Sequence, residues 1–324
     1  LYYDSLETLK KEKPAFVFCT NQRVMLGVAP LLAAQDLGIP TACFIFSWDN
    51  LPKGTKIIET DFYFVWSQHM KNELLHYHPE IQENQIKITG TPQFESHYDE
   101  NNFIEREVFF KIHNLDTNKK YICYSGDDIT TCPDDEVYLN DVAKAVSELN
   151  QKGHNLGIIF RRSPVDFSTR YDSVLKEFKN IIVPINPDWR KIGEGWNTIL
   201  PTPNDNSLLV NTIRHSELVI NLGSSMVFDF AIFNKPCLYI NYDVENKKDK
   251  NWSVKKIYQF VHFRSMTSRE AVGWISDSQS IASVIEKNLS KKQNIEATKW
   301  FEKITCQPAN LASDRIWKSI NSII

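Results

Sequence analysis

The sequence lacks the long apolar runs that would let a helix cross a lipid bilayer. No stretch approaches the roughly 18–20 consecutive apolar residues that a spanning helix needs, and no segment has the pattern of a secretory signal peptide. The six cysteines form no C-x-x-C pair and no zinc-like spacing, and most of them lie in apolar runs. We therefore expect a reduced, cytoplasmic protein, either free or at the inner face of the membrane.

A strong charge of one sign is also missing. The 324 residues carry a formal net charge of −3 at pH 7, which gives no overall reason to expect a nucleic-acid partner. With 42% hydrophobic residues and no internal repeat or low-complexity tract, the chain is that of an ordinary globular protein, long enough for two domains. The basic stretch 246–256 is either a solvated loop or a contact for anionic lipid or a charged acceptor.

Apolar runs alternate with helical patterns through the first hundred residues. Strands are expected at 15–20, 40–47, 61–67 and 86–90, with helices at 24–38 and 68–77. Continuous apolar strands separated by helices are typical of a parallel sheet that is covered on both faces. The charged segment 92–120 then connects this part to the rest of the chain.

The same alternation begins again after residue 120. Strands are expected at 121–125, 156–162, 180–185, 217–222 and 236–242, with helices at 136–151, 171–179, 207–216, 278–289, 293–304 and 310–324. Two successive alternations predict an α/β protein with two doubly wound domains. Because such sheets bind ligands beyond the carboxyl ends of their strands, the loops at those ends are the candidate site.

The loop 223–225 carries the clearest site pattern. Gly223 permits a tight turn from strand to helix, and Ser224 and Ser225 add hydroxyls to the free N–H groups at the helix start, an arrangement that can bind an anion. Asp229 lies one helical turn after Ser225, on the same face. A capping box would need serine at 226, where the sequence has methionine. Asp229 therefore binds a ribose beside a phosphate, interacts with the helix dipole, or faces solvent.

Two arginines end another strand of the second half. Arg161 and Arg162 follow the apolar run "LGIIF", and arginine suits bidentate contact with phosphate. Either both bind a diphosphate, or one of them faces solvent and pairs with Asp166. Gly126 ends the run "YICYSG" and allows a ligand to approach the backbone closely. The two aspartates that follow it either bind a sugar hydroxyl or cap a turn.

Polar residues also end two strands of the first half. Asn21 and Arg23 lie in "CTNQR", and Trp48, Asp49 and Asn50 lie in "FSWDNLPKG". The second group combines a stacking surface, a candidate general base and a hydrogen-bonding amide, as a carbohydrate site would. The alternative is a turn in which the aspartate and the asparagine bond the backbone.

With these residues assembled, the chain resembles the GT-B superfamily of nucleotide-sugar glycosyltransferases. The segment "HSELVINLGSSMVFDFAIFNKPCLYINYD" is similar to the part of those enzymes that contains a small-residue loop, a donor-binding acidic residue one helical turn later, and Lys-Pro before the next strand. The stretches "FSWDNLPKG", "DFYFVWSQHMKNELL" and "IKITGTPQFE" resemble the first domain of bacterial surface-polysaccharide transferases. A comparable "SS…D" element occurs in the related CDP-glycerol glycerophosphotransferases.

The resemblance implies two Rossmann-like domains facing a cleft. The acceptor-side domain would span 1–105, with the helix at 308–324 packed back on it, and the donor-binding domain would span 106–307. Four strands are expected before residue 92, fewer than this fold usually has. We therefore expect either that N-terminal strands are absent or that the first domain is reduced.

The resemblance also assigns roles to the candidate residues. The loop 223–225 would hold donor phosphate, with Gly126, and Asp229 would bind ribose or sugar hydroxyls. The two arginines stand where the related enzymes have a basic residue before a proline. The glycerophosphotransferases have Lys-x-His-Pro there, whereas this chain has Arg-Arg-Ser-Pro. The missing histidine favours sugar transfer over polyol-phosphate transfer.

The function implied is that of a metal-independent glycosyltransferase in bacterial surface-polysaccharide synthesis. It would move a sugar from a nucleotide-diphosphate donor, with UDP as the first expectation, to a glycan or lipid-linked acceptor bound near Asn21, Arg23, Trp48 and Asn50. Asp49 would be the catalytic base if the reaction inverts configuration. No cofactor is expected, because the nucleotide sugar is a substrate. A polyol-phosphate transferase, a sugar-nucleotide 2-epimerase and a non-catalytic sugar-nucleotide-binding module stay open as alternatives.

Overall fold

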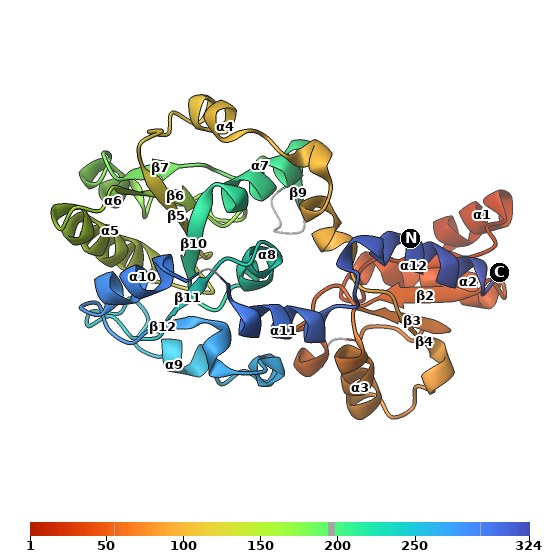
Figure 1. Ribbon diagram of the computed structural model, residues 1–324. Coiled ribbons are helices and arrows are strands. Elements are labelled where there is room, and N and C mark those ends of the chain that lie inside the picture. Colours follow the sequence, from red (N-terminus) through yellow and green to blue (C-terminus); the bar gives the residue numbers. More distant parts are fainter. Residues whose placement is uncertain (55, 194–197, 292) are drawn as a thin grey trace. The chain divides into compact units, whose positions relative to one another are not determined.

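The chain divides into two compact units. The computed structural model describes residues 1–54, 56–193, 198–291 and 293–324. Unit 1 comprises Leu1–Tyr98 and Glu302–Ile324, and unit 2 comprises Asp99–Phe301. Each unit contains a parallel β-sheet with helices packed against it (Figure 1), so both have the α/β class expected from the sequence.

Unit 1 contains a four-stranded parallel sheet in the order β1-β2-β3-β4. Its strands are β1 (Val17–Cys19), β2 (Thr41–Phe44), β3 (Phe62–Val65) and β4 (Ile86–Ile88), and its longer helices are α1 (Tyr2–Glu12), α2 (Val28–Asp36), α3 (Gln68–Tyr77) and α12 (Ala312–Asn321). Nearly all residues of β2 and β3 are buried. This is the burial expected of central strands in a covered parallel sheet.

The C-terminal segment of the chain returns to unit 1. Glu95 accepts hydrogen bonds from the N–H and the hydroxyl of Ser313, both at 2.6 Å, at the start of α12. Arg315 donates to the carbonyl oxygen of Thr89 at 3.2 Å. A carboxylate at a helix N-terminus satisfies a free N–H group and interacts favourably with the helix dipole. Glu95 therefore ties α12 to the segment that follows β4.

Unit 2 contains a six-stranded parallel sheet in the order β12-β11-β10-β5-β6-β7. These strands are β5 (Lys120–Ser125), β6 (Leu156–Arg161), β7 (Ile182–Pro184), β10 (Ser216–Asn221), β11 (Cys237–Ile240) and β12 (Gly273–Ile275), and β8 (Trp189–Lys191) forms a separate antiparallel pair with β9 (Ile199–Pro201). Its α-helices include α4 (Arg106–Ile112), α5 (Asp135–Gln151), α6 (Asp172–Glu177), α7 (Pro203–Arg214), α8 (Met226–Ile232), α9 (Val254–Ile257) and α10 (Ile281–Leu289). α11 (Ile295–Ile304) leads from unit 2 into unit 1.

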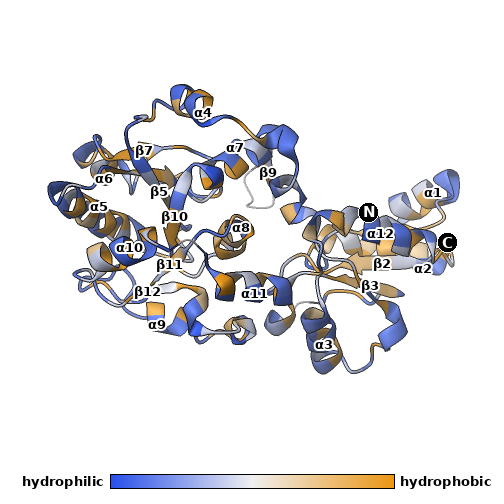
Figure 2. Ribbon diagram, viewed as in Figure 1, coloured by the Kyte–Doolittle hydropathy of each residue, from blue (hydrophilic) through white to orange (hydrophobic). Residues whose placement is uncertain are grey.

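Both faces of the larger sheet are covered. Ile122 and Tyr124 of β5 point to one face and belong to a core that includes residues of α5 and α10. Tyr121 belongs to a second core with Phe109 and Phe110 of α4, because successive side chains of a strand point to opposite faces. Figure 2 shows apolar colours in the central strands and a mixture of apolar and polar residues along α5. The sheet is therefore rigid enough to position the loops at its edge.

The border between the units lies earlier in the chain than the sequence predicts. Residues 99–105, expected in the first domain, are bonded to α7 of unit 2. The buried side chain of Asn211 donates to the carbonyl of Asn102 at 2.7 Å and accepts from the N–H of Ile104 at 2.8 Å. The return to unit 1, expected at 308, occurs at Glu302. A single asparagine within a helix gives no sequence signal of such an anchor.

The predicted strands and helices are present, most of them with shorter bounds. The predicted helix 68–77 coincides with α3, whereas the helix predicted at 24–38 is divided into a 3-10 turn at Met25–Gly27 followed by α2. The sequence pattern misses α1, the hairpin of β8 and β9, and the edge strand β12. α1 buries no residue and each of these strands has three residues, so none shows a long apolar pattern.

Candidate functional site

The strand order of unit 2 creates a topological switch point at the carboxyl ends of β5 and β10. From β5 the chain builds outward through β6 to β7, and it then crosses back to β10 and builds in the other direction to β12. Doubly wound sheets bind ligands in the crevice between two such loops. Within the residues described for unit 1, the order β1-β2-β3-β4 has no such reversal. The switch point therefore defines the candidate site.

The loop after β10 depends on Gly223. Its φ of 71° lies in the left-handed region, and a Cβ atom here would lie 3.1 Å from Phe263. The N–H of Ser224 donates to Oδ1 of Asn221 at 2.9 Å, and the Ser224 hydroxyl accepts from the N–H of Met226 at 3.3 Å. Ser224 therefore caps the start of α8. Because α8 has only seven residues, its helix dipole is short. The positions of the N–H groups of this loop therefore depend mainly on the loop conformation.

Asp229 is buried in the first turn of α8. Its exposed fraction is 4%, so the alternative in which it faces solvent is wrong. Ser225 precedes the helix and makes no capping bond through its side chain, and the third helical position is Phe228, so no capping box forms. Burying a carboxylate is costly unless polar groups surround it. The roles of Asp229 and the 223–225 loop in donor binding stay predictions.

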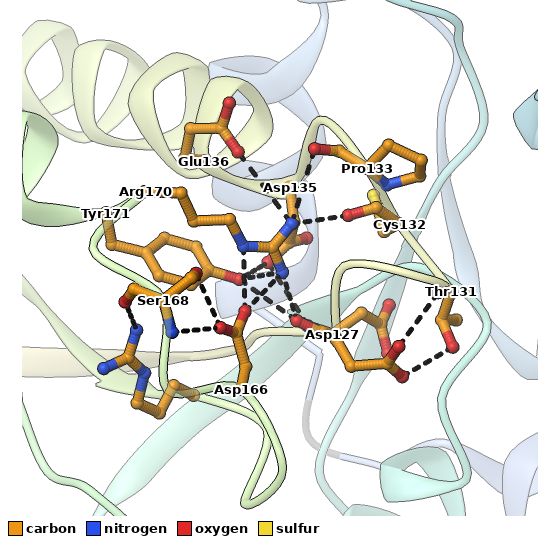
Figure 3. A network of polar contacts seen from close by, with 12 residues as sticks. Asp127, Thr131, Cys132, Pro133, Asp135, Glu136, Asp166, Ser168, Arg170 and Tyr171 are labelled. Carbon is orange, nitrogen blue, oxygen red and sulfur yellow. Dashed lines mark hydrogen bonds and ion pairs between the residues drawn. The ribbon is translucent and has the colours of Figure 1, made fainter. Parts of the chain in front are cut away.

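Arg170 joins the loops that follow β5 and β6 (Figure 3). Its guanidinium donates to the carbonyl oxygens of Asp127 and of Cys132, the latter at 2.6 Å, and lies 2.7 Å from the carboxylate of Asp166. It also lies 4.7 Å from the ring centre of Tyr171. Arg170 therefore fixes the two loops relative to each other. No sequence pattern marks Arg170 or Tyr171 for this role.

Gly126 ends β5 in a tightly packed position. A Cβ atom here would lie 3.0 Å from Phe160, and 3.1 Å from both the Asp135 carboxylate and the Tyr171 hydroxyl. Tyr171 donates to Asp135 at 2.6 Å beside this glycine. The hydrogen bond between these two side chains explains why a glycine is needed here. Close approach of a donor ligand to Gly126 stays a prediction.

Arg161 forms a buried ion pair with Asp205 in the first turn of α7. Its Nη2 lies 2.8 Å from each carboxylate oxygen, and the exposed fractions are 6% and 5%. Asp205 also accepts from the indole N–H of Trp189 at 2.7 Å and from the N–H of Asp188 at 2.9 Å. Arg161 is thus held by Asp205, while its Nη1 has no hydrogen-bond partner among the described residues, and binding of a donor diphosphate by Arg161 stays a prediction. Moving its guanidinium to a ligand would leave the buried Asp205 without its charge partner.

Arg162 is partly exposed and takes a different direction. It donates to the carbonyl of Ser168 at 2.7 Å and lies 5.4 Å from the ring centre of Tyr171. The alternative in which one of the two arginines pairs with Asp166 is wrong, because Asp166 pairs with Arg170. Arg162 is therefore the more exposed arginine of this pair, and its binding of a donor stays a prediction.

A cavity of about 630 Å³ opens beside the network of Arg170. Its walls are the loops 128–130 and 165–168, together with Lys191 and Ile199. Ile129 and Phe167 are 54% and 60% exposed, so the cavity offers apolar walls next to polar groups. Small-molecule sites usually combine these features at such volumes.

In unit 1, Trp48 and Asn50 are buried, with exposed fractions of 5% and 2%. Oδ1 of Asn50 accepts from Nε2 of Gln22 at 3.0 Å, and Oε1 of Gln22 accepts from the N–H of Phe46 at 2.9 Å. The acceptor-binding roles of Trp48 and Asn50 stay predictions. Asn50, through Gln22, holds the loops after β1 and β2 together. Gln22 completes this link, and only its place after a strand could have indicated it.

The other candidates of unit 1 keep some exposure. Oδ1 of Asn21 accepts from the N–H of Arg23 at 2.9 Å, which forms a local turn, and Arg23 is exposed. Asp49 forms an ion pair with Lys53 and accepts from Nδ2 of Asn50 at 3.1 Å. Acceptor binding by Asn21 and Arg23, and general-base catalysis by Asp49, stay predictions.

In the described part of the chain, no group of three or more His, Cys, Asp or Glu side chains is arranged to hold a metal ion. No helix among the described residues is long and apolar enough to cross a membrane. All six cysteines are free thiols.

Several solved structures resemble this chain. UDP-GlcNAc 2-epimerase from Neisseria meningitidis, bound to UDP-GlcNAc, matches with a TM-score of 0.64 and 13% identity, over 99% of this chain and 80% of that chain. A glycosyltransferase from Rickettsia africae matches with a TM-score of 0.56 and 13% identity, over 99% and 81% of the two chains. The wall teichoic acid polymerase TagF matches with a TM-score of 0.52 and 16% identity, over 85% and 60%.

No protein-family model and no curated protein matches the sequence. At the identities found, the structural likeness establishes the fold alone. That fold is GT-B, with two Rossmann-like domains, which confirms the fold predicted from the sequence.

Proposed function

We propose that this protein is a glycosyltransferase that moves a sugar from a nucleotide-diphosphate donor to a glycan or lipid-linked acceptor in surface-polysaccharide synthesis. The observation that carries the proposal is the switch point of unit 2. It brings the loop 223–225, with the buried Asp229 one turn behind it, to the same sheet edge as the loop after β5. The fold shared with a UDP-GlcNAc 2-epimerase and a glycosyltransferase supports a nucleotide sugar as the ligand.

In this proposal unit 2 binds the donor. N–H groups and hydroxyls of the loop 223–225 contact the diphosphate, and Asp229 accepts hydrogen bonds from hydroxyls of the ribose or the sugar. Arg162 offsets the negative charge that develops on the leaving nucleotide diphosphate. Fixed donors of this kind stabilise a transition state because they need no reorganisation during the reaction.

Unit 1 supplies the acceptor contacts. Asn21 and Arg23 lie at the end of β1, and Arg23 is exposed to an incoming ligand. Asp49 takes the proton of the acceptor hydroxyl if the reaction inverts configuration. In a retaining enzyme Asp49 is a binding residue.

A sugar-nucleotide 2-epimerase is the second candidate function. Epimerisation removes and returns a proton on the sugar ring, so it needs acid and base groups close to the bound donor. The carboxyl groups of Asp127 and Asp135 at the end of β5 are such groups. The epimerase found among the similar structures supports this alternative.

The two functions differ in their products. The protein is incubated with UDP-, GDP- and CDP-sugars, with and without oligosaccharide or lipid-linked acceptors, and the products are separated by chromatography. A glycosyltransferase releases free nucleotide and extends an acceptor, which is the expected result. An epimerase returns the nucleotide sugar with one inverted carbon. If neither product forms with any of these sugars, but nucleotides raise the melting temperature of the protein, both enzymatic functions are contradicted. That result would indicate a sugar-nucleotide-binding module.

A further inference from the structure

Three aspartates near the end of β5 differ in their hydrogen-bond donors: Asp127 and Asp128 follow the strand, and Asp135 begins α5. Figure 3 shows Asp127 and Asp135 close to Arg170. Asp128 accepts bonds from the backbone N–H groups and the hydroxyls of both Thr130 and Thr131. Such donors stabilise the ionised form of a carboxylate. Asp128 is therefore the cap of a turn, one of the two roles that the sequence left open.

Asp135 is also well supplied with donors. Its exposed fraction is 1%, and its carboxylate accepts from the hydroxyl of Tyr124 at 2.8 Å and from that of Tyr171 at 2.6 Å. The backbone N–H of Asp127 donates a third bond to it at 3.2 Å. These bonds compensate much of the cost of burying a charge.

The carboxyl group of Asp127 differs from both neighbours. No residue that the structure describes donates a hydrogen bond to it, and its Oδ2 is buried without a partner. Arg170 contacts Asp127 at the backbone carbonyl, and its other bonds go to Cys132, Pro133 and Asp166. An ionised carboxylate here would be partly desolvated and next to two other carboxylates. Among the three aspartates, a proton is therefore most stable on Asp127.

Asp127 lies beside the loop 223–225. It comes two residues after the end of β5, which is the neighbour of β10 in the sheet. Burial, and neighbouring charges that include Asp127, raise the pKa values of Tyr239 and Tyr258. Tyr239 donates to the carbonyl oxygen of Ser224 at 3.0 Å, and Tyr258 lies 3.4 Å from where a Cβ of residue 223 would be. Asp127 thus belongs to the switch-point crevice.

We propose that Asp127 carries a proton in the free protein and donates it in a hydrogen bond to a phosphate oxygen of the nucleotide diphosphate bound at the switch point. The nature of the ligand rests on the proposed function. A carboxylate at this place would repel a diphosphate, whereas a neutral carboxyl group offers an O–H donor. The residue as a whole keeps partial exposure, and the buried Oδ2 has no hydrogen-bond partner among the described residues.

The electrostatics of the cluster support this assignment. Burial, followed by the charges of Asp135 and Asp128, raises the pKa of Asp127 well above its usual range, although Arg170 lowers it. Burial raises the pKa of Asp135 to about 6, against the lowering effect of the Tyr171 and Tyr124 hydroxyls. Burial also raises the pKa of Asp128, but bonds from Thr130 and Thr131 outweigh it and lower the value overall. The titratable groups near Asp127 among the described residues include Asp128, Cys132, Asp135, Arg170, Tyr171, Tyr239 and Tyr258.

The first experiment measures the protonation state without a ligand. The aspartate carboxyl carbons are labelled with ¹³C, and the Asp127 resonance is assigned from its loss in Asp127→Asn. We expect this carboxyl to keep its proton at a pH where an ordinary aspartate, with a pKa of about 3.9, is already ionised. We also expect its resonance to shift when UDP is added.

The second experiment measures UDP affinity by calorimetry. Asp127→Asn keeps a donor but cannot ionise. At the acidic end of a pH series its affinity is expected within about threefold of wild type, and it should stay constant as the pH rises, whereas wild type weakens once Asp127 ionises. Asp127→Ala is expected to lose about tenfold, the effect of one hydrogen bond. Asp172→Asn, at an exposed aspartate of α6, is the control, and it keeps the pH dependence of wild type.

The outcomes separate this inference from the proposed function. An Asp127 that titrates at the ordinary aspartate value of about 3.9, in a protein that still binds UDP, contradicts the inference alone. The same holds if Asp127→Asn loses more than about tenfold in affinity, because the negative charge would then be needed. If the wild-type protein fails to bind UDP, GDP, CDP and inorganic pyrophosphate at every pH, the proposed function is contradicted. The proposed ligand contact of Asp127 is then contradicted as well.

Discussion

Aspartates of unit 2 have different roles because different groups surround them. Asp205 is paired with Arg161, Asp135 accepts bonds from two phenols, and Asp127 has no side-chain donor among the described residues. The sequence places Asp127 and Arg161 correctly at strand ends, because the apolar runs stop there. It does not predict that Arg161 turns inward, because the partner carboxylate lies 44 residues further along the chain. The positions of site residues are thus predictable, and their orientations depend on long-range partners.

Replacing Asp229 by alanine is expected to weaken nucleotide binding by more than about tenfold. A carboxylate that accepts bonds from two ribose hydroxyls contributes roughly 1.5–3 kcal/mol through hydrogen bonds to a charged group. Titration calorimetry with UDP measures the loss, and circular dichroism shows whether the variant is folded. Asp229→Asn keeps the size of the side chain and is expected to lose less. If Asp229→Ala binds UDP with wild-type affinity, the assignment of Asp229 to the nucleotide site is contradicted.

Stability should depend on pH through Asp127 and Asp135. The folded-state pKa of Asp135, about 6, lies above the unfolded value of about 3.9, so the folded protein binds more protons between these values. The free energy of unfolding therefore contains a contribution that is complete below about pH 4 and is lost as the pH rises through about 6. Asp127→Asn removes one carboxylate of this coupled pair and is expected to flatten the slope.

Urea denaturation at a series of pH values measures this slope. Asp172→Asn, at an exposed aspartate of α6, serves as the control and should retain the slope of wild type. A slope that is the same in wild type and Asp127→Asn would contradict the coupling.

At the scale of elements, apolar periodicity predicts what the cores contain. α3 has the bounds that its apolar pattern predicts. The pattern does not predict α1, because this helix buries no side chain. The Lys-Pro pair before β11 is one of the features that resemble the GT-B superfamily, and the sequence pattern alone assigns it no role. In the structure, Nζ of Lys235 donates to the carbonyl oxygens of Ile213, Arg214 and Ser216 at 2.9, 2.6 and 2.6 Å. Lys235 therefore caps the C-terminal end of α7, where a cation is favourable.

Replacing Lys235 by methionine is expected to lower the free energy of unfolding by about 2–4 kcal/mol, because three carbonyl oxygens lose their donor. Urea denaturation measures the change. Lys255→Met, at an exposed lysine of α9, is the control and should stay within about 0.5 kcal/mol of wild type. If the Lys235 variant were as stable as this control, the cap would not contribute.

For the whole molecule, the fold class follows from two rounds of strand and helix, but the borders of the units do not. These borders depend on polar anchors between distant segments. Asn211 holds the segment 99–105 on unit 2, and Glu95 holds Ser313, which lies 218 residues later. Hydrophobic patterning carries no information about such pairs. This is why the predicted border at 105 lies later than the observed one after Tyr98.

Replacing Glu95 by alanine is expected to destabilise unit 1 by about 1–2 kcal/mol, since the start of α12 loses its capping carboxylate. Hydrogen exchange should accelerate in α12, while the amides of β5 and β10 in unit 2 exchange at wild-type rates. Glu7→Ala, at an exposed position of α1, is the control. Faster exchange in β5 would show that the two units do not unfold separately.

The central claim is that unit 2 binds a nucleotide diphosphate at its switch point, and a crystal structure of the complex with UDP tests it most directly. The account predicts the diphosphate within hydrogen-bond distance of the N–H groups of residues 224–226, the ribose at Asp229, and the Asp127 carboxyl on a phosphate oxygen. UDP bound to unit 1, or with its diphosphate turned away from the loop 223–225, would contradict the account.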